Sequence, residues 1–163
     1  SCISPTPYHK QSSSSQDGFV IKKITDVKYQ ISFYGNDETG LDRANDYVIL
    51  RSAHEAANRG YPFFTILKKK STTTTQNYSY KKDHATPIKV VNKDGSVTMT
   101  TQYTAQYGNS VKKYAMTRPR VYTIIEFLED DYDQDKEILN SSEIIKKFSD
   151  KYNLKISISS EIK

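Results

Sequence analysis

A single long segment has the periodicity of an α-helix, and segments with the pattern of β-strands lie on both sides of it. The helical segment spans residues 39–60, with Thr39 as the expected N-cap and Gly60 as the residue that stops the last turn. At about 100° per residue, its apolar side chains fall on two opposite sides. One side can lie on a sheet, and the other side therefore predicts a cover from another segment or from a partner chain.

The strand segments share β-branched and aromatic residues, in part with strict alternation. They are residues 19–24, 28–36, 61–70 and 119–130. The first two predict a hairpin that turns at residues 25–27. Residues 141–153 predict a second, shorter helix with Ser141 or Ser142 as its N-cap, and residues 154–162 predict a last strand or a fraying tail.

Residues 71–116 are dominated by Tyr, Thr, Lys and Ser and fit neither pattern throughout. Within them, residues 87–103 predict a hairpin that turns at residues 92–95. The order of elements predicts an α+β fold, with a mainly antiparallel sheet, the long helix packed on one face, a short C-terminal helix and a long hairpin insert. We expect residues 1–18 to form a disordered tether and residues 19–163 to form a single domain, with residues 71–116 as its insert.

The chain has one cysteine, at position 2, and a polar segment follows it up to Gly18. A lone thiol has no partner for a disulfide, a zinc site or a redox pair. Two interpretations stay open: an incidental cysteine in a terminal tail, or a lipid anchor, because a small residue before Cys2 and a Ser-, Pro- and Gln-rich segment after it are typical of bacterial lipoproteins. As a tether, residues 3–18 would span at most ~50 Å when extended and ~20 Å as a flexible coil.

Charge and the positions of histidines bear on the remaining function classes. The formal charge of +5 comes from Lys and Arg residues scattered along the chain, which favours solubility over binding of nucleic acid. His9, His54 and His84 have no spacing typical of metal ligation or a catalytic relay, and the acidic run at residues 129–137 places Lys136 where a calcium-binding loop needs glycine. We therefore expect no catalytic residues, no metal site and no cofactor.

Two sets of residues are candidates for specific contacts. Arg51 lies in an apolar part of the long helix with Glu55 four positions later, which predicts a structural ion pair. Tyrosines alternate with Lys and Thr in the insert, either as a surface that stacks on sugars, bases or a protein, or simply as residues suited to exposed strands. The candidates for a binding role are Tyr78, Tyr80, Tyr103 and Tyr107.

Three blocks of the sequence are TPY at residues 6–8, YQISFYGN at residues 29–36 and DYVILRSAHEAANRGYPFF at residues 46–64. They resemble the signature blocks of a family of small Gram-negative envelope lipoproteins of unknown function, with departures from the family pattern at Ser52, His54 and Phe63. The resemblance implies lipidation of Cys2 and an envelope location, and Ile3 after the cysteine implies sorting to the outer membrane. The family has no established activity to carry over.

These observations together predict a non-enzymatic envelope lipoprotein with a structural or interaction function. Its expected partners are the membrane, through the lipid anchor, and an envelope protein, but not nucleic acid. The alternative is a module that binds a cell-wall or polysaccharide ligand through the tyrosine-rich hairpin.

Overall fold

The computed structural model describes residues 4–14, 16–81, 84–104 and 111–159, and within residues 76–88 and 99–115 it describes the backbone alone. The chain divides into two compact units. The first combines Ser1–Thr75 with Thr117–Lys163, and the second is Gln76–Met116. The expected single domain over residues 19–163 is thus divided, and the expected insert begins at residue 76 rather than 71.

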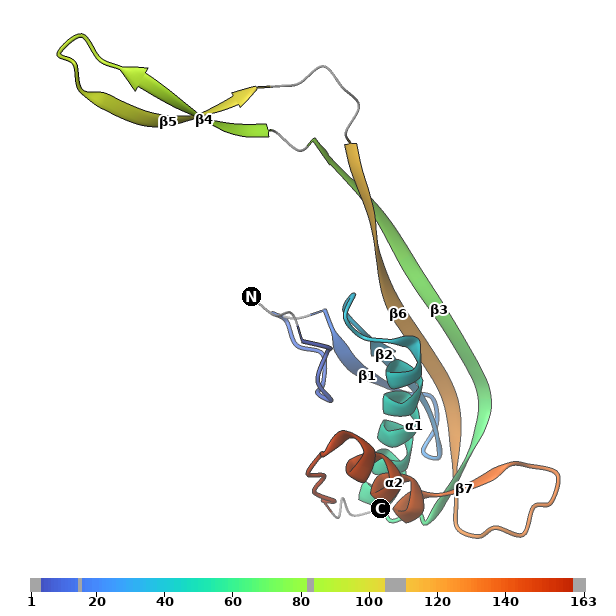
Figure 1. Ribbon diagram of the computed structural model, residues 1–163. Helices are drawn as coiled ribbons and strands as arrows, with labels where there is room; N and C mark the ends of the chain where they lie inside the picture. The colour runs from blue at the N-terminus through green and yellow to red at the C-terminus, as the bar shows by residue number, and fades with distance from the viewer. Residues whose placement is uncertain (1–3, 15, 82–83, 105–110, 160–163) are drawn as a thin grey trace. The chain divides into compact units, whose positions relative to one another are not determined.

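The first unit is built on a five-stranded antiparallel sheet, with two helices on one face (Figure 1). The strand order is β1-β2-β6-β3-β7, and β1–β2, β2–β6 and β3–β7 are paired antiparallel. The bounds are Gly18–Lys23 for β1, Lys28–Tyr34 for β2, Phe63–Lys81 for β3, Val111–Leu128 for β6 and Ile138–Asn140 for β7. The predicted α+β fold and the predicted β1–β2 hairpin are confirmed, whereas β7 had not been expected.

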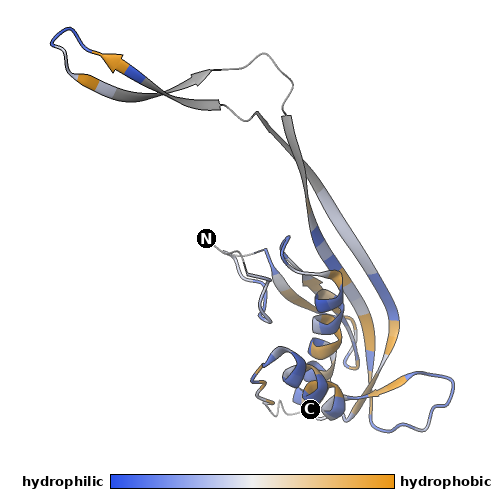
Figure 2. Cartoon of the chain, in the orientation of Figure 1, coloured by the Kyte–Doolittle hydropathy of each residue, from blue (hydrophilic) through white to orange (hydrophobic). Residues whose placement is uncertain are grey.

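The long helix α1 spans Leu41–Asn58 and packs on the sheet beside β2. Its residues Val48 and Ala53 are fully buried against the sheet, where Ile31 and Phe33 of β2 point toward the helix. Figure 2 shows hydrophobic residues on the strand segments beside α1 and a mixture of hydrophilic and hydrophobic residues on α1 itself. Neither α1 nor α2, the helices of the described part of the chain, is long and apolar enough to cross a bilayer.

The second helix, α2 (Ser141–Tyr152), covers the other side of α1. The Tyr152 ring lies 5.0 Å from the buried Tyr47 ring, centroid to centroid. At the same place the Asp46 carboxylate accepts hydrogen bonds from Lys151 Nζ at 2.6 Å and from the Tyr152 hydroxyl at 2.5 Å. The predicted cover of the second apolar side is therefore supplied by another segment of the same chain.

The helix ends differ from the predicted caps. The N-cap of α1 is Gly40, which has no side chain with which to cap the helix, so the assignment to Thr39 is wrong. The Thr39 hydroxyl bonds instead to the Thr6 amide and the Asn36 side chain. The N-cap of α2 is Asn140, whose side chain accepts from the Glu143 amide, so the assignment to Ser141 or Ser142 is wrong. Gly60 has a φ of 78° just after the end of α1, which confirms it as the stop.

The N-terminal residues lie on the domain, and the prediction of a disordered tether over residues 1–18 is wrong for residues 4–11. Thr6 is 1% exposed. Its amide donates to the Thr39 hydroxyl at 2.8 Å, and its own hydroxyl accepts from the Asn36 amide at 2.8 Å. The Asn36 side chain also donates to the Ser4 carbonyl at 2.8 Å and accepts from the Thr39 hydroxyl at 2.7 Å. We call these four residues the threonine knot.

A few residues after Thr6, residues 9–11 pair with the start of β1. Phe19 donates its amide to the His9 carbonyl, and its carbonyl accepts from the Gln11 amide, both at 2.9 Å. Gly18 has a φ of 118°, and a Cβ at this position would come 2.6 Å from the His9 carbonyl oxygen. Only glycine therefore permits this close approach at residue 18.

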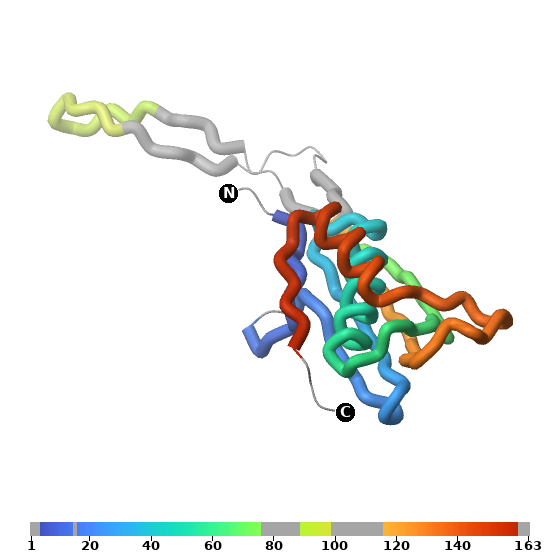
Figure 3. The backbone as a smooth tube through the Cα atoms, turned by 90° about the horizontal axis from the view of Figure 1, so that it is seen from below, coloured from blue at the N-terminus to red at the C-terminus, as the bar shows by residue number. Residues whose placement is uncertain are grey.

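The residues after α2 do not form the predicted last strand within the described range. Residues 154–159 run back along α1, as Figure 3 shows. The His54 side chain bonds to the Ser157 carbonyl at 2.8 Å, and the Ser159 amide donates to the Asn58 side chain at 3.0 Å. Helix side chains thus satisfy backbone groups that a sheet partner would otherwise have satisfied.

The second unit contains a hairpin of β4 (His84–Val91) and β5 (Val97–Thr104), which form a two-stranded antiparallel sheet. The turn lies at residues 92–95, where the Gly95 amide donates to the Asn92 carbonyl at 3.0 Å and Gly95 has a φ of 82°. The predicted hairpin and the position of its turn are confirmed.

Candidate functional site

Three charged side chains form a stripe at the C-terminal end of α1. Arg51, Glu55 and Arg59 follow one another at intervals of four residues, so they lie on one face of the helix. Both guanidinium groups contact the Glu55 carboxylate, and the Glu55 side chain is only 5% exposed. The predicted Arg51–Glu55 ion pair is confirmed. Arg59 was missed, although the same spacing could have indicated it. We call these three residues the arginine–glutamate cluster.

Aromatic rings hold the two guanidinium groups of this cluster in place. The guanidinium carbon of Arg51 lies 4.3 Å from the centroid of the Phe19 ring, and that of Arg59 lies 4.4 Å from the Tyr29 ring. Arg59 Nε also donates to the Tyr29 hydroxyl at 3.1 Å. Stacking on β1 and β2 therefore leaves the guanidinium edges, rather than their faces, for polar contacts.

His54 links the cluster to both ends of the chain. Arg51 Nη1 lies 3.0 Å from His54 Nδ1, and because a guanidinium can only donate, Nδ1 must accept. The other ring nitrogen then carries the proton and donates to the Ser157 carbonyl. The Tyr8 hydroxyl lies 3.2 Å from the same Nδ1. Burial, with the nearby Arg51 charge, lowers the pKa of His54, and burial raises the pKa of the Tyr8 hydroxyl above its usual range.

A hollow of about 380 Å³ lies beside the arginine–glutamate cluster, and we call it the basic hollow. Side chains alternate along a strand, so Ile21 and Lys23 share the side of β1 on which Phe19 faces α1. Lys23 is also the direct cross-strand partner of Tyr29. The lining consists of Lys10, Ile21, Lys23, Tyr29, Arg51, Glu55 and Arg59. Four cations thus face one carboxylate.

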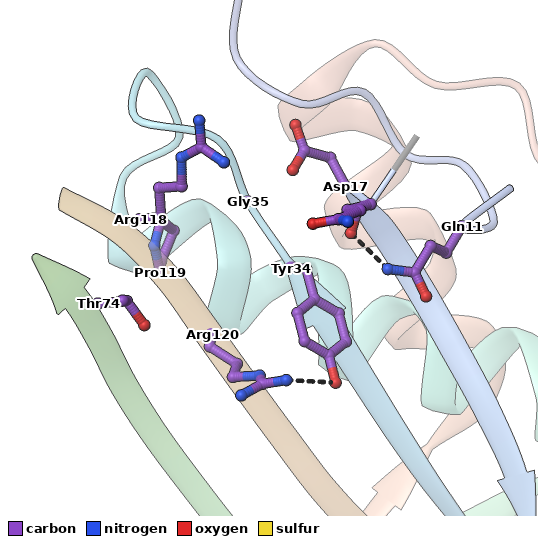
Figure 4. A pocket seen from close by; sticks show the side chains of 9 residues that line it. Gln11, Asp17, Tyr34, Gly35, Thr74, Arg118, Pro119 and Arg120 are labelled. Carbon is purple, nitrogen blue, oxygen red and sulfur yellow. Dashed lines mark hydrogen bonds between the residues drawn. The ribbon is translucent and has the colours of Figure 1, made fainter. Parts of the chain in front are cut away.

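A second hollow, of about 490 Å³, lies at the other end of β1 and β2 (Figure 4). Arg120 lies over the Tyr34 ring at 4.4 Å and donates to its hydroxyl at 3.1 Å. Gly35 is required here, because a Cβ would lie 2.8 Å from Pro119 Cγ. The lining consists of Gln11, Gln16, Asp17, Tyr34, Gly35, Thr74, Arg118, Pro119 and Arg120. Two cations and one carboxylate line this hollow, so its charge is less one-sided than that of the basic hollow, where four cations and one carboxylate lie.

The described side chains of the second unit's hairpin, residues 89–98, are all exposed, and we call this part the hairpin tip. They include three valines: Val90, Val91 and Val97 are 40%, 67% and 50% exposed. Val91 and Val97 are direct cross-strand partners, so their side chains form one apolar patch beside the turn.

The other residues singled out from the sequence are placed only in part. Cys2 and Tyr107 lie outside the described residues. Tyr78 and Tyr80 belong to β3 and Tyr103 belongs to β5, in stretches where the backbone alone is described. Their binding role therefore stays a prediction.

Neither a metal site nor a similarity to a known protein indicates what these hollows and the hairpin tip do. In the ranges that the structure describes, no three His, Cys, Asp or Glu side chains gather as a potential metal site. No protein-family model, no curated protein and no solved structure matches the chain.

Proposed function

We propose that this protein is a non-enzymatic lipoprotein of the bacterial cell envelope, anchored through an acylated Cys2, and that it acts by contact with an envelope protein. The anchor is supported by the lone cysteine, the small residue before it and the resemblance of three sequence blocks to envelope lipoproteins. Two or more acyl chains give lasting attachment where a single chain is marginal. With Ile3 after the cysteine, the outer membrane is the proposed location.

Because the N-terminal residues are docked on the first unit, an anchor at Cys2 would hold that unit close to the membrane. The Asn36 side chain donates a hydrogen bond to the Ser4 carbonyl, so Ser4 is the first residue of the threonine knot along the chain. Only Ile3 would then separate the acylated residue from the folded unit, a reach of about 7 Å instead of the ~20 to ~50 Å of a free tether. The first unit would therefore lie directly at the membrane surface.

The hairpin tip is the observation that carries the interaction function. Its exposed valines do not contribute to a buried core, and apolar side chains that gather in this way on a surface mark contact sites. A two-stranded sheet also leaves strand edges that can pair with another chain. We place the contact with the partner protein at Val91 and Val97, which are direct cross-strand partners.

Metabolic labelling of the full-length gene product tests the anchor. Radiolabelled palmitate should enter the wild-type protein and should not enter the Cys2→Ser variant. If wild type takes up no label, or if the precursor has no hydrophobic segment and lipobox before Cys2, the anchor is wrong.

Photo-crosslinking in living cells tests the contact. A photoreactive residue at position 91 should give a discrete adduct with a protein. The same residue at position 24 is the control, because Ile24 is also an exposed apolar side chain, at 48%, but belongs to the first unit. Equal crosslinking at both positions, or none at position 91, contradicts the proposal. Binding of a soluble polysaccharide that disappears in the Tyr103→Ala, Tyr107→Ala variant would support the glycan-binding alternative instead.

A further inference from the structure

We infer that the free edge of β3 is a docking site for an extended acidic segment of a partner protein, which adds to the sheet as a further strand. We call the part of β3 over residues 66–75 the β3 edge. It belongs to the first unit, so the inference depends neither on the lipid anchor nor on the contact proposed at the hairpin tip. It rests on the length of this edge, on its charge and on the contacts that hold it extended.

The β3 edge is a long side of the sheet that no described segment covers. β3 lies between β6 and β7 in the strand order, and β7 pairs only with residues 63–65. Beyond Thr65, β3 continues beside β6 with no other strand of the described chain on its outer side (Figure 1). Because successive residues of a strand direct their backbone groups to opposite sides, about half of residues 66–75 present an unpaired amide and carbonyl outward.

The two outer strands of the sheet are protected against pairing with another chain. β1 pairs at its start with residues 9–11, and β7 is only three residues long. Natural sheets limit unwanted pairing by such covers, by short edge strands, by proline and by charge. β3 is 19 residues long and contains no proline, and its charges on the β3 edge are three consecutive lysines.

These lysines decide which kind of strand can pair with the β3 edge. Lys68, Lys69 and Lys70 are exposed, and none of them forms an ion pair with another described residue. Like charges on directly opposite residues of two strands destabilise the pair, and opposite charges stabilise it. The lysines therefore oppose a basic strand, and also a second copy of this chain whose lysines would face them, but they favour a strand with carboxylates.

The β3 edge is also held in an extended conformation by the rest of the first unit. The Ser71 hydroxyl donates to the Asn45 side chain of α1 at 2.9 Å, and the Thr72 hydroxyl donates to the Arg120 carbonyl of β6 at 3.3 Å. Residues 72–75 are all threonines, whose β-branched side chains suit a strand. A strand that is already ordered loses little conformational entropy when another strand pairs with it, so backbone hydrogen bonds can supply affinity and the lysines specificity.

Two synthetic peptides and the purified full chain test the inference. The acidic peptide has about ten residues, with glutamates to face Lys68, Lys69 and Lys70 between threonines and valines, and the basic peptide has lysines in place of the glutamates. Fluorescence anisotropy should detect binding of the acidic peptide, and the basic peptide should bind at least about tenfold more weakly. On binding, amides of residues 66–75 should become protected from hydrogen exchange, which contact with lysine side chains alone would not cause.

Charge reversal on the β3 edge is the most specific variant. Lys68→Glu, Lys70→Glu should weaken binding of the acidic peptide at least about tenfold and should allow the basic peptide to bind. Lys146→Glu, Lys155→Glu is the control, because it makes the same change of charge at exposed positions outside β3, and it should change binding less than about twofold. All four lysines are exposed, so neither variant removes a buried contact.

Several other results would overturn the inference. If the lysines only keep the β3 edge free of partners, neither peptide binds. If charge alone holds the acidic peptide, a form of it with N-methylated backbone amides, which cannot donate to the edge, binds as tightly. If a second copy is the occupant, sedimentation shows a dimer in the absence of peptide, with the same amides protected. Equal binding of the acidic and basic peptides, or equal effects of the two variants, also contradicts the inference.

Discussion

The surface around α1 and the hairpin tip use side chains in opposite ways. Around α1, polar and charged groups are buried: Thr6, Glu55 and Ser52 are 1%, 4% and 0% exposed. At the hairpin tip, apolar groups are exposed, with Val91 at 67%. Buried polar groups cost free energy unless they are paired, and exposed valines gain nothing for the fold. The residues of the first region therefore contribute to stability, whereas the exposed valines of the second contribute little to it and lie where we propose the contact with a partner.

The largest effect is expected where the buried charges are separated. Glu55→Ala leaves both guanidinium groups without their carboxylate, and we expect it to lower the free energy of unfolding by about 3–5 kcal/mol. Urea denaturation measures this loss. Glu38→Ala is the control, because Glu38 is exposed, and it should stay within about 0.5 kcal/mol of wild type. Similar effects of the two variants would contradict the structural role of the cluster.

A smaller loss is expected when the threonine knot is opened. Thr39→Val keeps the shape of the side chain but removes the acceptor for the Thr6 amide and the donor to Asn36. A buried donor without a partner costs about 1–3 kcal/mol, and urea denaturation should show a loss of this order. Proteolysis should also cut the N-terminal residues faster in this variant. Unchanged stability and unchanged cleavage would mean that residues 4–11 are a free tether after all.

The pH dependence of stability should report on His54. Burial and the Arg51 charge lower the pKa of His54 in the folded state. Below the ordinary value of about 6.5, the unfolded chain therefore binds a proton at His54 more readily than the folded chain does. Stability should therefore be full above about pH 6.5 and fall as the pH drops below it. Protonation would also place a donor on Nδ1 against Arg51 Nη1 and the Tyr8 hydroxyl. His54→Gln should reduce the slope between pH 7 and pH 5 in urea denaturation, and an identical slope would refute this role.

The smallest effect on stability is expected at the hairpin tip. Val91→Ser should change the free energy of unfolding by less than about 0.5 kcal/mol, since the side chain is exposed. The same change should reduce the yield of adduct from a photoreactive residue at the neighbouring position 97. A large loss of stability with no loss of crosslinking would reverse the contrast between the two regions.

Local patterns could be predicted from the sequence, and contacts between distant residues could not. The β4–β5 turn follows from the residues at positions 92–95, and the Arg51–Glu55 pair follows from helical spacing. Thr39 has the chemistry of an N-cap, but its hydroxyl is engaged with Thr6, 33 residues earlier in the chain. No periodicity signals such a partner.

The two chain ends show the same limit. Residues 4–11 have the composition of a tether, and residues 154–159 alternate like a strand. Each is positioned instead by side chains of distant elements, Asn36 for the first and His54 with Asn58 for the second. Lys10 and Lys23 were likewise not recognised as a pair, because only the pairing of residues 9–11 with β1 brings the N-terminal segment to the basic hollow.

Hydrogen exchange of single amides in the full chain compares the two regions most directly. The Thr6 and Asn36 amides donate to hydroxyl groups within the threonine knot and should exchange as slowly as the amides of β2. The Asn92 and Gly95 amides bond only across the turn of the hairpin tip and should exchange much faster. Exchange at Thr6 as fast as at Gly95 would contradict the assignment of the N-terminal residues to the folded unit.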